Sequence, residues 1–138
     1  MRLELYQQET ERLARDLQAM LDDVSQRLHQ HQALSALEQA GVLHALQVLT
    51  ENAIGKAKLL IKQRQQTVPV SAYDAFAQLH RDHTIDDQAM RHWTAAIGLR
   101  NRIVHDYLNV DMTVIETLVK ERQYQLQVQF LLKPIFSA

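Results

Sequence analysis

Chain-breaking residues are scarce in this sequence, and their scarcity restricts the fold more than any other feature. Only three glycines and two prolines occur among the 138 residues. Alanine, leucine, glutamine, glutamate, lysine and arginine are abundant, and these residues have the highest helix propensities. The composition therefore predicts an all-α fold built from long helices.

The length and the apolar content predict one compact unit. Hydrophobic residues make up 46% of the chain, which is enough to form a buried core in a protein of this size. No internal repeat, low-complexity tract or linker divides the sequence. We expect residues 1–138 to form a single helical domain.

Charge, cysteine content and hydropathy exclude several classes of function. The formal net charge is -1, so the chain lacks the basic excess of a non-specific nucleic-acid binder, and any such contact must be local. The absence of cysteine excludes disulfides and thiolate metal sites. The first residues, MRLELYQQET, lack the apolar segment of a signal peptide, and no stretch is apolar enough to span a membrane. We therefore predict a cytoplasmic protein without membrane contact.

Helix boundaries follow from apolar periodicity and from capping boxes. Apolar residues at three-and-four spacing from Leu3 to Leu28 predict one amphipathic helix of about seven turns. Serine or threonine three residues before an acid then marks further helix starts. These pairs, which predict helices over 35–64, 71–81, 85–107 and 112–132, are Ser35 with Glu38, Ser71 with Asp74, Thr84 with Asp87, and Thr113 with Glu116. The expected architecture is a helical bundle with two long antiparallel helices and three further helices.

The helix predicted over 85–107 carries a charge on its apolar seam. At about 100° per residue, one narrow seam contains Met90, Trp93, Ile97, Arg100, Val104 and Tyr107. A guanidinium group keeps its proton at any ordinary pH, and burying it without a partner costs several kcal/mol. Arg100 therefore requires an anion or a solvated cleft.

His105 lies beside this seam and shares a side of the helix with Asn101 and Gly98. The glycine leaves bare backbone where another helix or a ligand could approach, although it costs about 1 kcal/mol relative to alanine. Two interpretations remain open. In the first, Arg100 pairs with an acid of a neighbouring helix, and His105 and Tyr107 have no catalytic role. Structural ion pairs of this kind are the commoner explanation for a charged residue on an apolar seam. Alternatively, the arginine stabilises charge on a phosphoryl group and the histidine moves a proton, as metal-free RNA cleavage requires.

The segment GLRNRIVHDY, residues 98–107, resembles the Arg-x4-His-x-Tyr signature of HepT-type toxins in the HEPN superfamily. Arg100, His105 and Tyr107 occupy the motif positions without a gap, and Asn101 supplies the polar residue that usually follows the arginine. HepT-like proteins are small all-α chains of about this length. Their signature lies on the penultimate long helix, where the capping boxes place it here.

The resemblance implies a metal-independent endoribonuclease that acts as a homodimer, with two motifs facing each other across a cleft. Arg100 would then bind and stabilise the scissile phosphate of an RNA substrate. His105 would act as general acid or base during attack by the ribose 2′-hydroxyl, which leaves a 2′,3′-cyclic phosphate, and Asn101 would position one of them. No cofactor is implied.

The resemblance also implies a partner and an off-switch. In this family, an MntA-type nucleotidyltransferase antitoxin silences the toxin by transferring AMP to the motif tyrosine, here Tyr107, in a type VII toxin–antitoxin system. A non-catalytic subunit that binds a nucleotide or substrate for a nucleotidyltransferase is the alternative, and a plain helical interaction protein is a third reading. A titratable histidine is needed only by the enzyme, so the presence of His105 favours the ribonuclease.

Two local basic stretches could contact RNA. One contains Lys56, Lys58, Lys62 and Arg64, and the other Arg91, Arg100 and Arg102. Such stretches can follow a phosphate backbone, although on helices they are more often solvated faces. We single out Lys58, Lys62 and Arg102 as candidate RNA contacts.

Two pairs of histidines invite a metal-site interpretation. They are His29 with His31 and His80 with His83. Neither pair lies in a clustered set of further ligands, and neither belongs to a zinc-protease motif. We therefore predict no metal.

Overall fold

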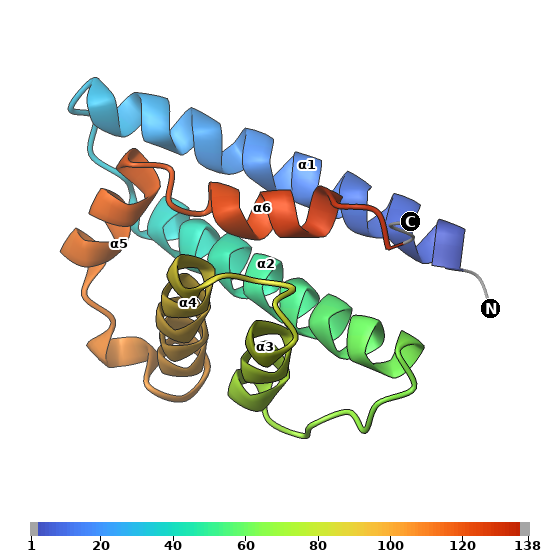
Figure 1. Cartoon of the computed structure of the whole chain (residues 1–138). Coiled ribbons are helices and arrows are strands. Elements are labelled where there is room, and N and C mark those ends of the chain that lie inside the picture. Colours follow the sequence, from blue (N-terminus) through green and yellow to red (C-terminus); the bar gives the residue numbers. More distant parts are fainter. Residues whose placement is uncertain (1–2, 136–138) are drawn as a thin grey trace.

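The computed structural model describes residues 3–135, and every regular element in this range is helical. In order along the chain they are α1 (Leu3–His29), α2 (Ala36–Gln63), α3 (Ala72–Arg81), α4 (Asp87–His105), the 3-10 helix η1 (Tyr107–Asn109), α5 (Met112–Lys120) and α6 (Gln125–Leu132) (Figure 1). The all-α prediction is confirmed. None of these helices is both long enough and apolar enough to cross a membrane.

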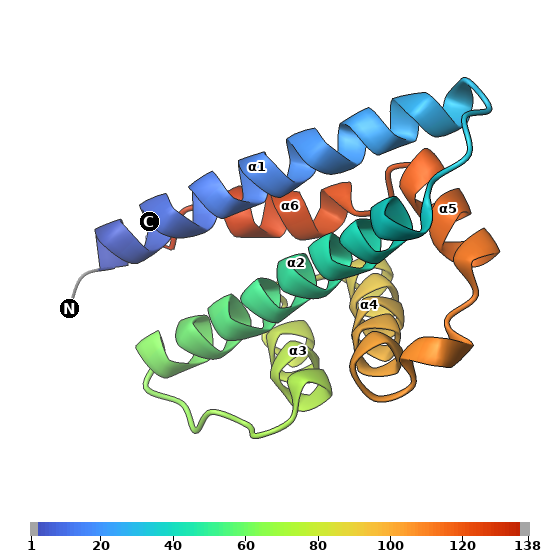
Figure 2. The ribbon, with the colours of Figure 1, turned by 180° about the vertical axis from the view of Figure 1, so that it is seen from behind.

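The central element is α2, which packs against α1 and α6 on one side and α3 and α4 on the other, whereas α5 packs on α1. The two long helices, α1 and α2, run antiparallel as predicted, and α6 lies alongside α1 in both views (Figures 1 and 2). On the other side, α3 and α4 contact each other and cross α2 steeply. The C-terminal end of α4 points away from α1 and α6, and the chain continues there into η1. This arrangement places the end of the motif segment, residues 98–107, on the side of the molecule away from α1 and α6 (Figures 1 and 2).

An aromatic cluster fixes the first half of α4 to its neighbours. The Trp93 ring stacks on Phe76 of α3 with 4.3 Å between centroids, and its edge meets Phe130 of α6 at 5.2 Å. Met90 and Ile97 are buried on the same seam. Because these contacts anchor α4 through its N-terminal turns, they also determine which side Arg100 faces.

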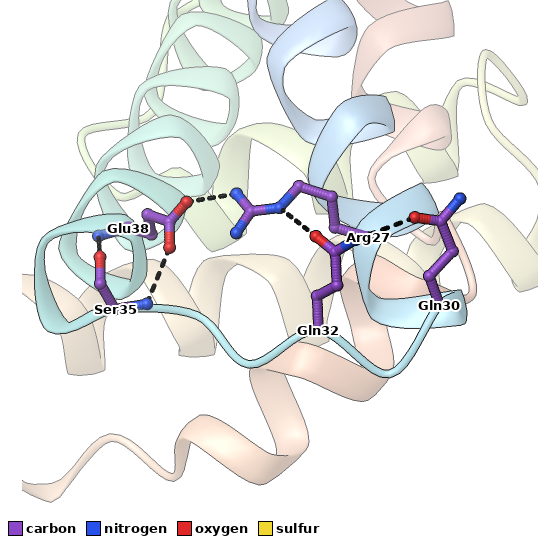
Figure 3. A network of polar contacts seen from close by, with 5 residues as sticks. All are labelled: Arg27, Gln30, Gln32, Ser35 and Glu38. Carbon is purple, nitrogen blue, oxygen red and sulfur yellow. Dashed lines mark hydrogen bonds and ion pairs between the residues drawn. The ribbon is translucent and has the colours of Figure 1, made fainter.

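The turn between α1 and α2 is held by a network of polar side chains (Figure 3). Glu38 and Ser35 form the predicted capping box, and Arg27 of α1 bonds to Glu38 and, at 3.1 Å, to Gln32. The bond from Arg27, together with the backbone N–H of Ser35, lowers the pKa of Glu38 to about 2. The network therefore joins the two long helices at the point where their direction reverses.

Two of the four predicted caps are correct and two are wrong. Ser71 accepts a bond from the Asp74 N–H at 3.0 Å, as the sequence predicts. Thr84 does not cap α4: its N–H closes the end of α3 by bonding to the Leu79 carbonyl at 2.9 Å, and its hydroxyl accepts from Arg64 at 2.7 Å. The N-cap of α4 is Asp86, and its carboxylate accepts from Ala89 at 2.7 Å.

The last predicted helix, over 112–132, is divided into α5 and α6. It begins at the cap Asp111, so Thr113 lies inside the first turn instead of capping it. The break falls at Arg122, which has a left-handed backbone with φ of 56°. The Gln123 N–H reaches back to the Leu118 carbonyl at 3.1 Å, which closes α5 as in a Schellman motif.

Contacts with α1 hold this break in place. The Arg122 guanidinium donates to the Ser25 hydroxyl at 3.3 Å, and the buried Tyr124 donates its hydroxyl to Asp22. Burial and the neighbouring carboxylate both raise the pKa of Tyr124. A local helical preference is thus overridden by tertiary contacts with a segment about a hundred residues earlier.

A buried lysine caps the C-terminal end of α6. Lys56 of α2 is only 1% exposed, and its ammonium donates to the carbonyls of Phe130 at 2.7 Å, of Leu131 at 3.2 Å and of Lys133. These carbonyls lie at the helix end, where helical partners are missing. Lys56 was expected in an exposed basic stretch, and that expectation is wrong because its ammonium serves as a helix cap.

Replacing Lys56 with methionine is expected to lower the free energy of unfolding by about 1–3 kcal/mol at neutral pH, because buried carbonyls lose their donor. Burial lowers the pKa of Lys56 from 10.5 to about 8, so the unfolded chain binds more protons between these values. The stability of the parent, relative to Lys56→Met, should therefore rise from pH 8 to 10.5. Urea unfolding at several pH values measures this difference.

Lys58→Met is the matched control, because Lys58 is a solvent-accessible lysine two residues further along α2. Its effect should stay within about 0.5 kcal/mol at every pH. Equal stability of the parent and Lys56→Met at neutral pH would contradict the capping role, and a difference that shrinks as the pH rises would contradict the lowered pKa of Lys56.

Candidate active site

The side chain of Arg100 lies at the point where the α4 seam passes from the core to the surface. Met90, Trp93 and Ile97 precede it in the core, whereas Val104 follows it as an exposed residue. The Arg100 side chain is 23% exposed, and its Nε atom is buried without a hydrogen-bond partner among residues 3–135. The arginine is therefore embedded in protein but retains unused donors.

The nearest anion to Arg100 is Glu51 of α2. The distance from Arg100 Nη1 to Glu51 Oε2 is 3.8 Å, which is too long for a hydrogen bond. Glu51 offsets the charge but leaves the fork of guanidinium N–H groups available for a planar, bidentate anion. The structural interpretation predicted an acid on a neighbouring helix, and Glu51 is such an acid. No hydrogen bond joins it to Arg100, however.

His105 and Asn101 lie one turn apart on the solvent side of α4. His105 is the last residue of the helix, and both side chains are exposed. Neither forms a side-chain hydrogen bond within the described part of the chain. Their spacing of four residues places them next to each other on the helix surface. The imidazole is thus accessible from solvent.

Tyr107 lies beyond the end of α4, in the short helix η1, and not on the helix as the periodicity predicted. The helix ends because Asp106 departs from helical geometry, with φ of -147° and ψ of 45°. Tyr107 is 48% exposed, and the following Leu108 is 94% exposed. Tyr107 therefore lies outside the core and is half-exposed.

A pocket of about 470 Å³ opens beside the motif, between α2, α4, α5 and the start of α6. Its walls are mainly apolar, with Leu99 and Ile103 from α4 facing Ile115 and Leu118 from α5. Arg100 lies at this pocket, and so do Arg102 and Gly98. A Cβ atom built on Gly98 would meet nothing within 4 Å, so no other helix within residues 3–135 approaches there. The space beside the glycine belongs to the pocket.

One polar pair is built into the pocket wall. His92 Nε2 lies 2.8 Å from Oε1 of Gln127, which is only 5% exposed. Burial lowers the pKa of His92, and the bond to Gln127 acts in the opposite direction. We assign the neutral imidazole as the donor to Oε1, which leaves the amide N–H2 of Gln127 without a partner in the described chain.

Comparison with known proteins assigns the chain to a family. The family model described as ribonuclease HepT-like matches residues 10–131. The chain belongs to the HepT-like ribonuclease family. The matched range runs from within α1 to within α6 and includes the whole segment from Gly98 to Tyr107, so the resemblance drawn from the motif is confirmed at the level of the family.

Two individual proteins resemble this HepT-like chain. The mRNA nuclease HepT of Shewanella oneidensis is 35% identical over 78 residues, which cover 55% of this chain and 59% of that relative. The match therefore spans about three fifths of the relative's length. A crystal structure of a toxin–antitoxin with AMP-PNP superposes with a TM-score of 0.75 at 19% identity, covering 91% of this chain and 96% of that chain. At this identity the second likeness shows the fold.

The candidate RNA contacts of the HepT-like chain do not all lie together. Arg102 lies at the same pocket as Arg100. Lys58 and Lys62 lie on α2, roughly 10 and roughly 16 Å further along the helix axis than Glu51, the partner of Arg100. Lys58 also donates to the Val70 carbonyl at 2.7 Å. The two lysines are therefore separated from the motif.

The histidine pairs do not form a metal site in the part of the chain that the structure describes, where no group of three potential ligands lies together. Two of these histidines have a different role. His31 and His83 adopt left-handed backbones, with φ of 60° and 59°, and each lies just after the end of a helix. His80 instead contacts the Asp87 carboxylate at 2.6 Å, which lowers the pKa of Asp87.

Three residues of the site were missed by reasoning from the sequence, namely Glu51, His92 and Gln127. Glu51 could have been found, because Arg100 requires an anion and Glu51 is an acid on the long helix α2. His92 and Gln127 carried no signal. They are 35 residues apart and are brought together only by the packing of α6 against α4.

Proposed function

We propose that this chain is the toxin of a type VII toxin–antitoxin system and that it cleaves RNA without a metal ion. Its family and its mRNA nuclease relative support the ribonuclease activity. The observation that carries the proposal is Arg100, whose guanidinium group lies at a pocket with a buried, unpartnered Nε and only a distant carboxylate. An RNA phosphate supplies the anion that this arrangement lacks.

In the proposed reaction, the ribose 2′-oxygen attacks the adjacent phosphorus and the bond to the 5′-oxygen breaks. His105 accepts the proton of the 2′-hydroxyl, and the protonated His105 of a second copy donates a proton to the leaving 5′-oxygen. Arg100 stabilises the negative charge on the phosphoryl oxygens. Asn101, one turn before His105, positions the imidazole or the phosphate. The products are a 2′,3′-cyclic phosphate and a 5′-hydroxyl.

The proposed active form is a homodimer in which two motifs face one cleft. Each chain offers one Arg100 and one His105, whereas the reaction uses both a base and an acid. Large exposed apolar residues lie close to the motif, at Val104, Leu108 and Val114. Such residues on the surface are typical of a contact with another protein. A symmetric contact at this end of α4 would place the two histidines near each other.

RNA cleavage by the purified protein should persist when excess EDTA is present, because the charge stabilisation comes from Arg100 and not from a metal. The products should carry 2′,3′-cyclic phosphate ends, which are identified by mass spectrometry and by their resistance to polyadenylation. Loss of cleavage on chelation, with recovery on adding Mg²⁺ or Mn²⁺, would indicate a metal nuclease instead.

We further propose that an MntA-type nucleotidyltransferase antitoxin silences the toxin by modifying Tyr107. The phenolic oxygen attacks the α-phosphorus of ATP, pyrophosphate leaves, and the phenolic proton passes to a base of the antitoxin. The half-exposed position of Tyr107 in η1 supports this step, because an enzyme can reach the hydroxyl without unfolding the bundle. The added phosphodiester is negative and lies two residues from His105, so it would repel RNA phosphate.

Incubation with ATP and a nucleotidyltransferase encoded beside this gene should add the mass of one or more AMP groups to the protein. The modified peptide should contain Tyr107, and Tyr107→Phe should remain unmodified. Tyr73→Phe is the matched control, since Tyr73 is similarly exposed but lies on α3. Modification that persists in Tyr107→Phe would exclude this residue.

A further inference from the structure

The pocket beside Arg100 has properties that cleavage of the RNA backbone does not require. Phosphate chemistry needs the guanidinium group and the imidazole, and His105 is not among the residues that line the pocket. Nevertheless, an open pocket of about 470 Å³ with mainly apolar walls lies there, and its volume is in the range typical of pockets for small organic ligands. The pocket therefore has room for a part of the substrate other than the phosphate.

From this pocket we infer that the protein holds one unstacked base of its RNA substrate between α4 and α5, next to the scissile phosphate. The inference rests on the proposed ribonuclease function and adds a base-binding subsite to it. The flat faces of a base would lie against the apolar walls formed by Leu99 and Leu118. Stacking and apolar contacts of this kind are common in the recognition of single-stranded RNA.

The polar groups of the pocket match the edge of a base. Gln127 lines the pocket and is almost fully buried, and its Oε1 atom is held by His92, so its N–H2 group has no partner within the described chain. This group can donate to a ring nitrogen or a carbonyl oxygen of a base. A groove for an apolar helix of a partner protein would have no use for a buried amide and imidazole.

The path from the motif to the pocket lies along one side of α4. Gly98 and Arg102 both line the pocket, and on the helix surface they lie two turns and one turn before His105. The space beside Gly98 is open, and Arg102 adds a second cation, besides Arg100, to the lining of the pocket. An RNA strand with its phosphate between Arg100 and His105 can therefore direct the adjoining base into the pocket. This use also explains a glycine in the middle of α4.

Ala95→Leu tests the subsite by filling the pocket, because Ala95 lies on its wall and is accessible at its mouth. Leucine adds volume without a flat ring that could itself stack on a base. Thr94→Leu is the matched control, since Thr94 is the exposed neighbour and does not line the pocket. Cleavage of an RNA library by parent and variants is mapped by sequencing the product ends.

The parent should prefer particular bases on one side of the cleaved bond. Ala95→Leu should cleave the preferred sites about tenfold more slowly and with a flattened preference, whereas Thr94→Leu should match the parent. Equal rates and equal preferences in Ala95→Leu and the parent would overturn the inference. A change of oligomeric state in Ala95→Leu, measured by sedimentation, would also overturn it, because the pocket would then belong to a contact between copies.

A second measurement does not depend on cleavage. RNA with a 2′-O-methyl group at the cleaved nucleotide cannot react, and 4-thiouridine or 6-thioguanosine beside that nucleotide can be crosslinked by light. The crosslinked peptides should come from residues 92–103 or 114–127 in the parent and should be lost in Ala95→Leu. Crosslinks that form only elsewhere would exclude the subsite. Crosslinks at the pocket in a protein that cleaves no RNA would contradict the ribonuclease proposal and leave base binding intact.

Discussion

Replacing His105 with alanine is expected to lower the rate of RNA cleavage by about 10²–10⁴-fold, which is the usual contribution of general acid–base catalysis. In the proposed reaction this one side chain serves as base in one copy and as acid in the other, so both proton transfers are lost. The measurement is the cleavage rate of a defined RNA at saturating enzyme. Growth inhibition on expression should disappear in parallel.

The fold should not change, because the imidazole is exposed and bonds to no other described side chain. Thermal unfolding of His105→Ala should therefore match the parent. His44→Ala is the control, since His44 is an exposed histidine on α2, away from the motif. Added imidazole should restore part of the activity of His105→Ala, which a purely structural histidine would not allow. A variant as active and as toxic as the parent would exclude the catalytic role.

Helix positions were predictable because their signals are local. The capping box at Ser35 and the cap at Ser71 use residues three positions apart, and the structure contains both. The cap at Thr84 was wrong although its sequence pattern is equally good. Its N–H bonds at the end of α3 and its hydroxyl accepts from Arg64, while Asp86 caps the next helix. Competition between neighbouring signals thus limits the accuracy of such boundaries.

The division between α5 and α6 could not be predicted from local signals alone. One hint existed, because no apolar residue occupies 120–123 between Val119 and Tyr124. The break itself depends on Asp22 and Ser25 of α1, which hold Arg122 and Tyr124 from a distant part of the sequence. A chain of strong helix formers is interrupted there by tertiary contacts and not by glycine or proline.

The candidate site was found in the sequence because a charge occupied an apolar seam. The same criterion applied to α2 would have identified Lys56, which follows Leu49 by seven residues and Ala53 by three. Their roles differ for a reason that only the fold reveals. Lys56 meets three carbonyls at the end of α6, whereas Arg100 meets one carboxylate at 3.8 Å and a pocket. A misplaced charge thus indicates that an anion or acceptor exists, but not which one.

Replacing Arg100 with lysine is expected to lower cleavage by about 10²–10³-fold although the charge is kept. Lysine presents a compact ammonium group, whereas the arginine fork can bond two phosphoryl oxygens at once. Stability should change by less than about 0.5 kcal/mol, because the partner carboxylate is too distant for a strong interaction. Cleavage rates and urea unfolding of the same preparations provide the two measurements.

Glu51→Gln separates the two interpretations of the arginine. If Arg100 serves only an ion pair, Glu51→Gln should lower stability, Arg100→Lys should retain it because the charge is kept, and both variants should cleave RNA as the parent does. If Arg100 binds RNA phosphate, removing the competing carboxylate should leave cleavage intact or strengthen RNA binding several-fold, while Arg100→Lys remains impaired. Arg91→Lys, an exposed change on the same helix, should behave as the parent. Full activity in Arg100→Lys would exclude bidentate binding of phosphate by Arg100 and would make Arg102 the next candidate for the phosphate-binding residue.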